Sequence, residues 1–356
     1  MDETLKEEIV KRFFIGPWIA ALAFIVPAPA SAQPHPGVAE IAAQKGEGRL
    51  QTLIDGAKKE GEVSVYLSQP NMALVTQAFG KKYGIRVKVW RASSENVLQR
   101  VVSEARGGRA DVDLVQSSAP EMEALHREKL LQPVASPFLA DLMPQAIPGH
   151  RDWVGIAINR LVQSYNTSKI RKEDLPKSWQ DLLNPKWKGQ LGIEASDQHW
   201  FAYVLQDLGQ EKGIKLFKDI VAANGISVRR GHSLLAQLVA SGEVPLALTV
   251  YSWNPEELKQ KGAPVERFDI GAPIAQFLGF GLLGKSPHPH AAVLLYDFML
   301  SDGQEILSKQ HAIATSMKYD LDEKKVPMRF IDPAQTLDLN DKWTRTFEEL
   351  FVSRAR

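Results

Sequence analysis

VSVYLS (63–68), IRVKVW (85–90) and VDLVQSS (112–118) are three strand-forming runs, and the chain between them has the apolar spacing of helices. In SENVLQRVVSEARGG (94–108), apolar residues recur on one helical face, and Gly107 and Gly108 end the helix. Strands that alternate with helices of this length form a parallel sheet with right-handed crossovers. The sequence therefore predicts an α/β fold whose strand-to-helix loops open on one edge of the sheet, where such sheets bind ligands.

Each of these three loops carries small polar residues at the start of the next helix. They are Ser68, Gln69 and Asn71 in the first loop, Ser93 and Ser94 in the second, and Ser117 and Ser118 in the third. Helix N-termini present free N–H groups and the positive end of the helix dipole, which favours anionic or oxygen-rich ligands. Any one of these residues alone is more often a simple helix cap, so the prediction concerns the loops as a group.

Composition bounds the class of protein. The chain has 356 residues, of which 44% are hydrophobic and 24% charged, and this length is enough for two domains. Lys plus Arg (43) nearly equals Asp plus Glu (42), so no basic excess indicates nucleic-acid binding. The absence of cysteine excludes disulfides, thiolate metal sites and cysteine nucleophiles.

The N-terminus has the pattern of a signal peptide. Lys11 and Arg12 precede the apolar run FFIGPWIAALAFIVPAPA, which is interrupted by prolines and followed by the small residues Ala30-Ser31-Ala32. We therefore expect a signal peptide over residues 1–32 rather than a membrane anchor. Residues 33–61 are predicted to form a leader and a first helix.

Two long strand-forming runs, WVGIAINRLVQSYN (153–166) and GAPIAQFLGFGLLG (271–284), are long enough to pass from one domain into another. We expect residues 62–157 to form a first lobe to which residues 272–325 return. Residues 158–271 would form a second lobe, on which the C-terminal segment 326–356 packs. Two such crossovers make a hinge, and the expected working motion is closure of the lobes around a ligand held between them.

Four motifs carry a resemblance to a known family: AKKEGEVSVY (57–66), SWQDLLNPKWKGQLGI (178–193), LVASGEVPLAL (238–248) and HPHAAVLLYDFMLSDGQEIL (288–307). In these motifs the chain resembles the periplasmic substrate-binding proteins of ABC importers, specifically the iron(III)-type branch. The resemblance implies a two-lobed type II periplasmic binding fold, a periplasmic location, and delivery of a small-molecule solute to the membrane subunits of an ABC permease. We expect a monomer without a cofactor and without catalytic activity.

Iron-binding members of this branch hold the metal with an adjacent pair of tyrosines, often with a histidine after the first strand, and a Gly-Arg-x-Arg run in the hinge accompanies the bound anion. This chain has Gln69-Pro70-Asn71 after the first strand, Thr249-Val250-Tyr251-Ser252-Trp253 where the tyrosine pair falls, and Ile158-Asn159-Arg160-Leu161 in the hinge run. These departures favour a small polar or anionic organic solute, with Arg160 as a candidate contact. A ferric site with a modified ligand set that includes Tyr251 is the alternative.

The second lobe offers further candidate ligand contacts: Ser196, His199, Arg229, Arg230, His232, Tyr251 and Trp253. Arginine beside histidine at a helix start suits a carboxylate or phosphonate, and the aromatic side chains suit stacking on a ligand. The alternatives are a solvated basic turn for the arginines and packing between elements for the aromatics. An exported enzyme and a receptor-presenting protein stay open as other classes, although the spacing contains no recognisable set of nucleophile and base.

Overall fold

Two long strands, β5 (Trp153–Asn166) and β10 (Ile274–Leu283), pair antiparallel along the centre of the sheet and connect its two halves. The computed structural model describes residues 37–310, 312–319 and 322–352, which belong to one unit of the chain. The predicted signal peptide and residues 33–36 lie outside the described residues. Among the described helices, none combines the length and the apolar character needed to cross a bilayer.

The strand order of the sheet is β2-β1-β3-β10-β5-β8-β6-β7. The remaining members of this path are β1 (Glu62–Leu67), β2 (Arg86–Arg91), β3 (Leu114–Ser118), β6 (Leu191–Glu194), β7 (Ser227–Arg229) and β8 (Leu246–Tyr251). Four short strands pair beside it: β4 (Leu131–Gln132), β9 (Val265–Phe268), β11 (Ile313–Ala314) and β12 (Arg329–Phe330). Strands β1, β2 and β3 are parallel, as predicted, and so are β6, β7 and β8.

The helices are α1 (Val38–Ala43), α2 (Arg49–Glu60), α3 (Met72–Tyr83), α4 (Ser94–Arg106), α5 (Ala119–Arg127), α6 (Gln198–Leu208), α7 (Gln210–Asn224), α8 (His232–Ser241), α9 (Trp253–Gln260), α10 (Pro289–Leu300), α11 (Asp302–Lys309), α12 (Asp322–Lys325), α13 (Pro333–Asp338) and α14 (Asn340–Phe347). Short 3-10 helices cover Pro137–Asp141, Pro144–Ala146, Lys172–Asp174, Trp179–Leu183 and Pro185–Trp187. A π-helical turn, Glu348–Val352, follows α14.

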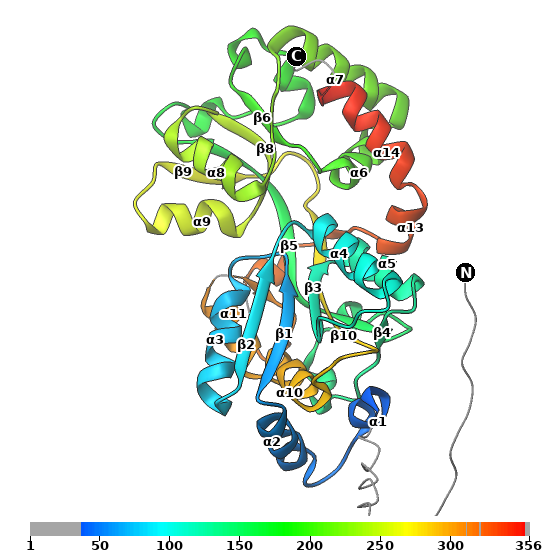
Figure 1. The fold of residues 1–356 in the computed structure, drawn as a ribbon. Helices are drawn as coiled ribbons and strands as arrows, with labels where there is room; N and C mark the ends of the chain where they lie inside the picture. Colours follow the sequence, from blue (N-terminus) through cyan, green and yellow to red (C-terminus); the bar gives the residue numbers. More distant parts are fainter. Residues whose placement is uncertain (1–36, 311, 320–321, 353–356) are drawn as a thin grey trace, which may run out of the picture. The chain divides into compact units, whose positions relative to one another are not determined.

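We call lobe 1 the half that contains β1–β4, α1–α5, α10 and α11, and lobe 2 the half that contains β6–β9 and α6–α9 (Figure 1). Each lobe has apolar clusters of its own on its part of the sheet. In lobe 1, α10 is buried on every side from Ala291 to Leu300, as expected for a helix that is apolar all round. The structure is thus the two-lobed α/β fold that the sequence predicted, joined by the two predicted strand crossings.

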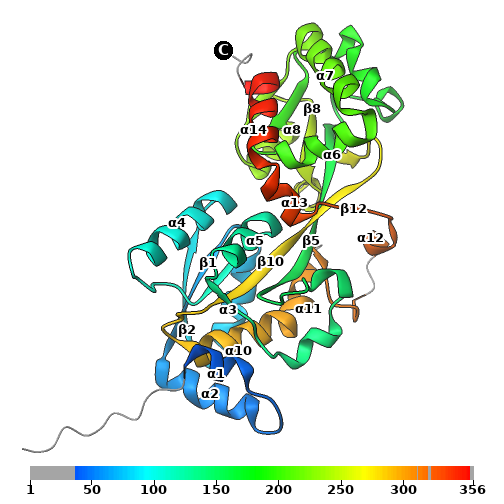
Figure 2. The same cartoon turned by 90° about the vertical axis from the view of Figure 1, so that its right-hand side faces the viewer.

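The C-terminal segment makes a third connection between the lobes. Strand β12 pairs with hinge strand β10, α13 lies along α5 of lobe 1, and α14 packs on α6 of lobe 2 (Figure 2). Arg127 of α5 donates from Nη1 to Asp338 of α13 over 2.7 Å, and from Nη2 to the carbonyl of Ala334 over 3.2 Å. The sequence predicted that this segment packs on lobe 2 and gave no sign of its contact with lobe 1.

Candidate functional site

The loop after β1 is held by a buried glutamine from the neighbouring strand. The backbone N–H groups of Ser68 and Gln69 donate to Gln116 Oε1 over 2.9 and 3.1 Å, and Gln116 Nε2 donates to Ser68 Oγ over 2.9 Å. Asn71 occupies the N-cap position of α3, but its side chain makes no capping bond. The structure therefore places the three polar residues of the first loop at the predicted edge of the sheet, and adds Gln116 as their support.

The predicted serines of the second and third loops meet at this edge. Ser93 caps α4 by accepting from the N–H of Asn96 over 3.3 Å. The hydroxyls of Ser94 and Ser118 are 2.9 Å apart, and Ser117 Oγ donates to the carbonyl of Ser94 over 3.4 Å. The N-termini of α4 and α5 are thus drawn together by serine hydroxyls.

In lobe 2, the ends of β6 and β8 and the start of α8 bring an acidic and aromatic cluster together. The rings of His232 and Tyr251 stack with centroids 4.0 Å apart, and His232 Nε2 lies 3.0 Å from Asp197 Oδ1. Glu194, buried at the end of β6, accepts from the backbone N–H groups of Gly231 (2.9 Å) and Ser196 (2.5 Å). These bonds fix the loops that precede α6 and α8.

Burial and charge shift the pKa values in this cluster. The pKa of Glu194 is raised mainly by burial and, after that, by the negative charge of Asp197. Burial lowers the pKa of His232, but the charge and hydrogen bond of Asp197 outweigh it, so the net shift is upward. The pKa of Tyr251 lies well above 10 because of burial first, and then the charges of Asp197, Glu194 and Glu121. Glu121 belongs to α5 of lobe 1, so the two lobes approach each other at Tyr251.

The hinge strands supply two more polar side chains. Asn159 of β5 lies opposite Gln276 of β10, so the two side chains share one face of the pair. Gln276 Nε2 donates to the hydroxyl of Tyr251 over 3.2 Å. Because neighbouring residues on a strand point to opposite faces, Arg160 lies on the other face, where it forms an ion pair with Asp269. Its predicted contact with a ligand therefore has no support from the geometry.

Several buried polar atoms around these elements have no hydrogen-bond partner. Among the described residues they include Asn71 Oδ1, Glu121 Oε2, Asn159 Nδ2 and Trp253 Nε1. Buried polar groups are nearly always paired, so each of these atoms is open to a hydrogen-bonding partner. Burial raises the pKa of Glu121 to about 7, with a further contribution from the charge of Glu95. Two acceptors and two donors from both lobes and the hinge are thus open to a polar ligand.

The remaining predicted residues lie outside this group. His199 bonds to Asn340 Oδ1 over 3.0 Å, and burial lowers its pKa. Arg229 donates to the carbonyl of Val228 over 3.2 Å and lies near Glu243. Arg230 and Ser196 are exposed after their strands. The sequence patterns did not single out Glu121, Glu194 or Gln276, although an acidic residue that ends a strand, such as Glu194, is a signal for a polar site.

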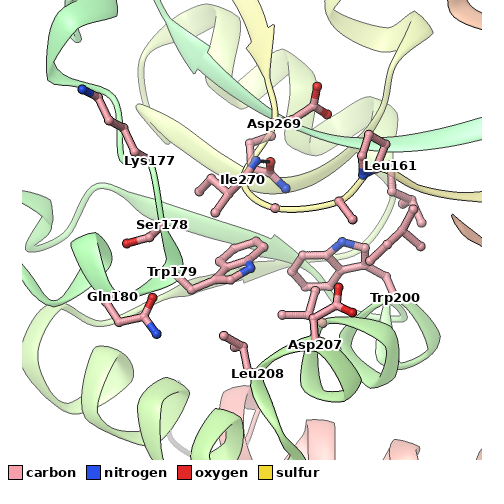
Figure 3. A pocket seen from close by; sticks show the side chains of 16 residues that line it. Leu161, Lys177, Ser178, Trp179, Gln180, Trp200, Asp207, Leu208, Asp269 and Ile270 are labelled. Atoms are coloured by element: carbon pink, nitrogen blue, oxygen red, sulfur yellow. Dashed lines mark hydrogen bonds between the residues drawn. The ribbon is translucent and has the colours of Figure 1, made fainter. Parts of the chain in front are cut away.

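A separate pocket of about 340 Å³ lies in lobe 2 beside the hinge. Figure 3 shows the indole rings of Trp179 and Trp200 along it, with Asp269 and Asp207 on opposite sides. Both carboxylates are engaged, Asp269 with Arg160 and Asp207 with Arg329. This pocket lacks the polar strand ends and helix starts described above, so we take those as the candidate site. We call them the interlobe group, with the members Asn71, Glu121, Asn159, Glu194, Asp197, His232, Tyr251, Trp253 and Gln276.

Two lobes on a continuous hinge, with convergent strand ends and helix starts between them, define the class of two-lobed solute-binding proteins. The chain belongs to the bacterial extracellular solute-binding protein family, which it matches over residues 75–323. It is 28% identical over 268 residues to an Fe(3+)-binding periplasmic protein of Serratia marcescens, covering 71% of this chain and 78% of that one. It is 23% identical over 287 residues to a proposed 2-aminoethylphosphonate-binding periplasmic protein of Salmonella typhi, covering 78% and 82%.

Solved structures show the same fold. Iron-bound HitA from Pseudomonas aeruginosa superposes with a TM-score of 0.69 at 25% identity, over 81% of this chain and 99% of that chain. AfuA from Actinobacillus pleuropneumoniae, with fructose-6-phosphate bound, superposes with a TM-score of 0.72 at 20% identity, over 82% and 99%. These findings confirm the resemblance on which the sequence prediction rested. The protein is a solute-binding component of the ABC importer type, and its relatives are binding proteins of transporters rather than enzymes.

Proposed function

We propose that this protein captures a small zwitterionic solute in the periplasm, by closing its lobes over the interlobe group, and delivers it to an ABC permease. Such a solute carries an ammonium group together with a phosphonate, phosphate or carboxylate group. The observation that carries the proposal is the buried, unpaired Glu121 Oε2 of lobe 1, whose charge acts on Tyr251 of lobe 2. The periplasmic location is supported by the relatives, which are periplasmic proteins.

In this proposal, the carboxylates bind the ammonium group of the solute. Glu121, Glu194 and Asp197 all act on Tyr251, and His232 already pairs with Asp197. A buried carboxylate oxygen without a partner is costly, and an ammonium donor to Glu121 Oε2 would satisfy both its charge and its hydrogen-bonding capacity. Asn71 Oδ1 is a second open acceptor on lobe 1.

The helix N-termini of lobe 1 bind the anionic group of the solute in this proposal. Helices α3 and α4 begin at the carboxyl ends of parallel strands, with Ser68 and Ser94 beside their first turns, whereas the first turn of α5 carries Glu121. Free N–H groups and the dipole at such helix starts favour an anionic group. A ligand that contacts lobe 1, lobe 2 and the hinge together is bound more tightly when the lobes close, because only the closed form offers every partner.

Titration calorimetry with three probes tests this reading. We expect 2-aminoethylphosphonate to bind, and both ethylphosphonate and ethylamine to bind at least tenfold more weakly, because each lacks one charged end. Glu121→Gln should weaken 2-aminoethylphosphonate at least tenfold, whereas Asp174→Asn, on the surface of lobe 2 beside Arg171, should not change its affinity. Equal affinity for 2-aminoethylphosphonate and ethylphosphonate would contradict the role given to the carboxylates.

Ferric iron is the second candidate, and one observation favours it. Glu194, Asp197 and His232 each offer a ligand atom, and these atoms lie within 4.8 Å of one another next to Tyr251. Hard anionic oxygen donors suit a trivalent cation. The raised pKa of Tyr251 keeps its phenol protonated, which opposes this reading unless the metal itself displaces the proton. Addition of ferric citrate to the protein would give a visible phenolate-to-iron absorption band for an iron site and none for the organic solute.

A further inference from the structure

A second group of possible metal ligands lies on lobe 1, where α5 meets the loop that leads into β5. Glu123 and His126 are three residues apart on α5 and so share one face of the helix. His150 comes from the loop before β5, and its ring stacks on that of His126 with centroids 3.7 Å apart and planes inclined by 12°. The helix and the loop are therefore joined through side chains that all coordinate metals readily.

The ligand atoms of this group are close enough to share one ion. One atom each from Glu123, His126 and His150 lies within 4.8 Å of the others. His150 Nε2 and Glu123 Oε2 are 3.1 Å apart. Two ligands at about 2.0–2.1 Å from a tetrahedral ion are separated by roughly 3.3 Å, but each imidazole binds a metal in its own ring plane. The His150 ring must therefore turn out of its stack on His126 before all three side chains can bind one ion.

Asp152 supplies the support that metal-binding histidines usually have. Its carboxylate accepts from Nδ1 of His126, which leaves Nε2 of that ring for a metal. Metal-ligating histidines commonly donate their second nitrogen to a carboxylate, which fixes the tautomer and the ring orientation. The same carboxylate lies 4.0 Å from Nδ1 of His150.

We propose that Glu123, His126 and His150 form a binding site for a divalent transition metal of the Zn²⁺ class, with Asp152 as their supporting carboxylate. Two imidazoles and one carboxylate are a donor set that Zn²⁺ favours, and the fourth position would hold water. The side chains are only 11% (Glu123), 29% (His126) and 22% (His150) exposed, so the group is held firmly and an ion can still reach it from solvent.

Metal binding requires a change of tautomer at His150. In the structure, Nδ1 of His150 accepts from the backbone N–H of Asp152 over 3.1 Å, so Nε2 carries the proton and donates to Glu123. When Nε2 and the Glu123 carboxylate both bind the metal, the proton moves to Nδ1 and bonds to the carboxylate of Asp152. His150 thus loses its hydrogen bond from the backbone N–H of Asp152 and gains one to the carboxylate of Asp152. The ion takes the place of the proton between His150 and Glu123.

The site lies where a bound ion would restrain the start of hinge strand β5. Asp152 directly precedes β5, and the ring of Trp153, the first residue of β5, lies 6.1 Å from that of His150. Arg127, one residue after His126, makes the contact of α5 with α13. A bound ion would therefore fasten α5 to the start of a crossing strand, next to the third connection between the lobes.

The test is metal binding by the whole protein after chelator treatment. We expect one Zn²⁺ per chain by titration calorimetry, a rise in the unfolding temperature, and visible Co²⁺ absorption of a tetrahedral site. His126→Asn, His150→Asn and Glu123→Gln should each weaken Zn²⁺ at least tenfold, and Asp152→Asn by about 10- to 100-fold. Circular dichroism would verify that each variant folds.

Two controls separate this site from other histidines and from the interlobe group. His290→Asn alters a histidine that pairs with Glu60 elsewhere on lobe 1, and His232→Asn removes a possible ligand of the interlobe group; neither should change Zn²⁺ affinity. Absence of stoichiometric Zn²⁺ binding would overturn the proposal, and so would Zn²⁺ binding that survives His126→Asn and His150→Asn. Binding lost only in His232→Asn would place the ion in the interlobe group and would also overturn it.

Discussion

Gln276 in hinge strand β10 donates a hydrogen bond of 3.2 Å to the hydroxyl of Tyr251 at the end of β8. On its face the same tyrosine ring stacks against His232 at 4.0 Å. The ring is thereby fixed between the hinge and the first turn of α8, and the hydroxyl is directed by a side chain on a strand that both lobes share. Any movement of β10 during closure would therefore also move the hydroxyl of Tyr251.

Removing this hydroxyl should weaken solute binding without unfolding the protein. Tyr251→Phe keeps the ring and its stack on His232, but it leaves Gln276 Nε2 without its acceptor. The bond to Gln276 is lost from the free and the bound protein alike, so the effect on affinity comes from a hydrogen bond between the hydroxyl and the solute. Loss of that bond costs about 0.5–1.5 kcal/mol, and we expect a three- to tenfold loss of solute affinity in calorimetry. The thermal unfolding midpoint should change by only a few degrees. Unchanged solute affinity would mean that the hydroxyl does not face the bound solute.

The raised pKa of Glu121 gives a prediction about stability. Its pKa is about 7 in the folded protein and 4.5 in an unperturbed carboxyl group, so the folded state holds the proton more tightly than the unfolded state. The group therefore favours folding below about pH 4.5, and this advantage is lost as the pH rises through 7. Solute-free Glu121→Gln should be more stable than the parent protein at pH 8 and no more stable at pH 4. Thermal unfolding of both proteins across this range measures the difference, and parallel curves would contradict the assignment.

The buried ion pair between Arg49 of α2 and Asp297 of α10 gives a prediction about lobe 1. Both side chains are almost fully buried, and Arg49 also donates from Nε to the carbonyl of Gln44 over 2.8 Å. Arg49→Met would leave the carboxylate of Asp297 buried without its partner, at a cost of about 3–5 kcal/mol in the free energy of unfolding. The double variant Arg49→Met with Asp297→Leu should recover much of that loss in denaturant unfolding. No recovery would show that packing, rather than the unpaired charge, causes the loss.

The fold was largely predictable because its signals are local. The run at 153–166 gave β5 with its observed bounds, and the run at 63–68 fell within one residue of β1. Strand β10 begins at Ile274 and not at Gly271, because Gly271 has a positive φ of 78° and Pro273 cannot donate to a ladder. Helix α9 was not predicted, and its Pro255 lies in the first turn, where a proline is tolerated.

The site was predictable only in part because its members meet through the tertiary fold. The loops after β1, β2 and β3 could be placed on one edge from strand order alone, and the structure puts their polar residues there. The approach of Glu121 to Tyr251 depends on how the two lobes face each other, which no local pattern encodes. Strand alternation places Asn159 and Arg160 on opposite faces of β5, but only the tertiary fold brings Asn159 beside Gln276. Likewise, His199 faces α14 because of its position on α6.

The ion pair between Arg127 and Asp338 links lobe 1 to the C-terminal segment and should favour the conformation seen here. Both side chains are substantially exposed, so the pair should contribute only about 0.2–1 kcal/mol. That is enough to shift an equilibrium between open and closed lobes by up to about fivefold. We expect Arg127→Ala to leave the unfolding midpoint nearly unchanged but to raise the solute-free radius of gyration in small-angle X-ray scattering.

A double-mutant cycle with Asp338→Ala would isolate this contact from other effects of the arginine, such as its approach to Glu123. The matched control is Arg171→Ala, which removes an exposed ion pair with Asp174 that lies wholly within lobe 2. If the contact with α13 restrains the lobes, Arg127→Ala and Asp338→Ala should change the radius of gyration by the same amount, and the double variant should add nothing further. A similar expansion in Arg171→Ala would mean that loss of surface charge, rather than loss of the link, opens the protein.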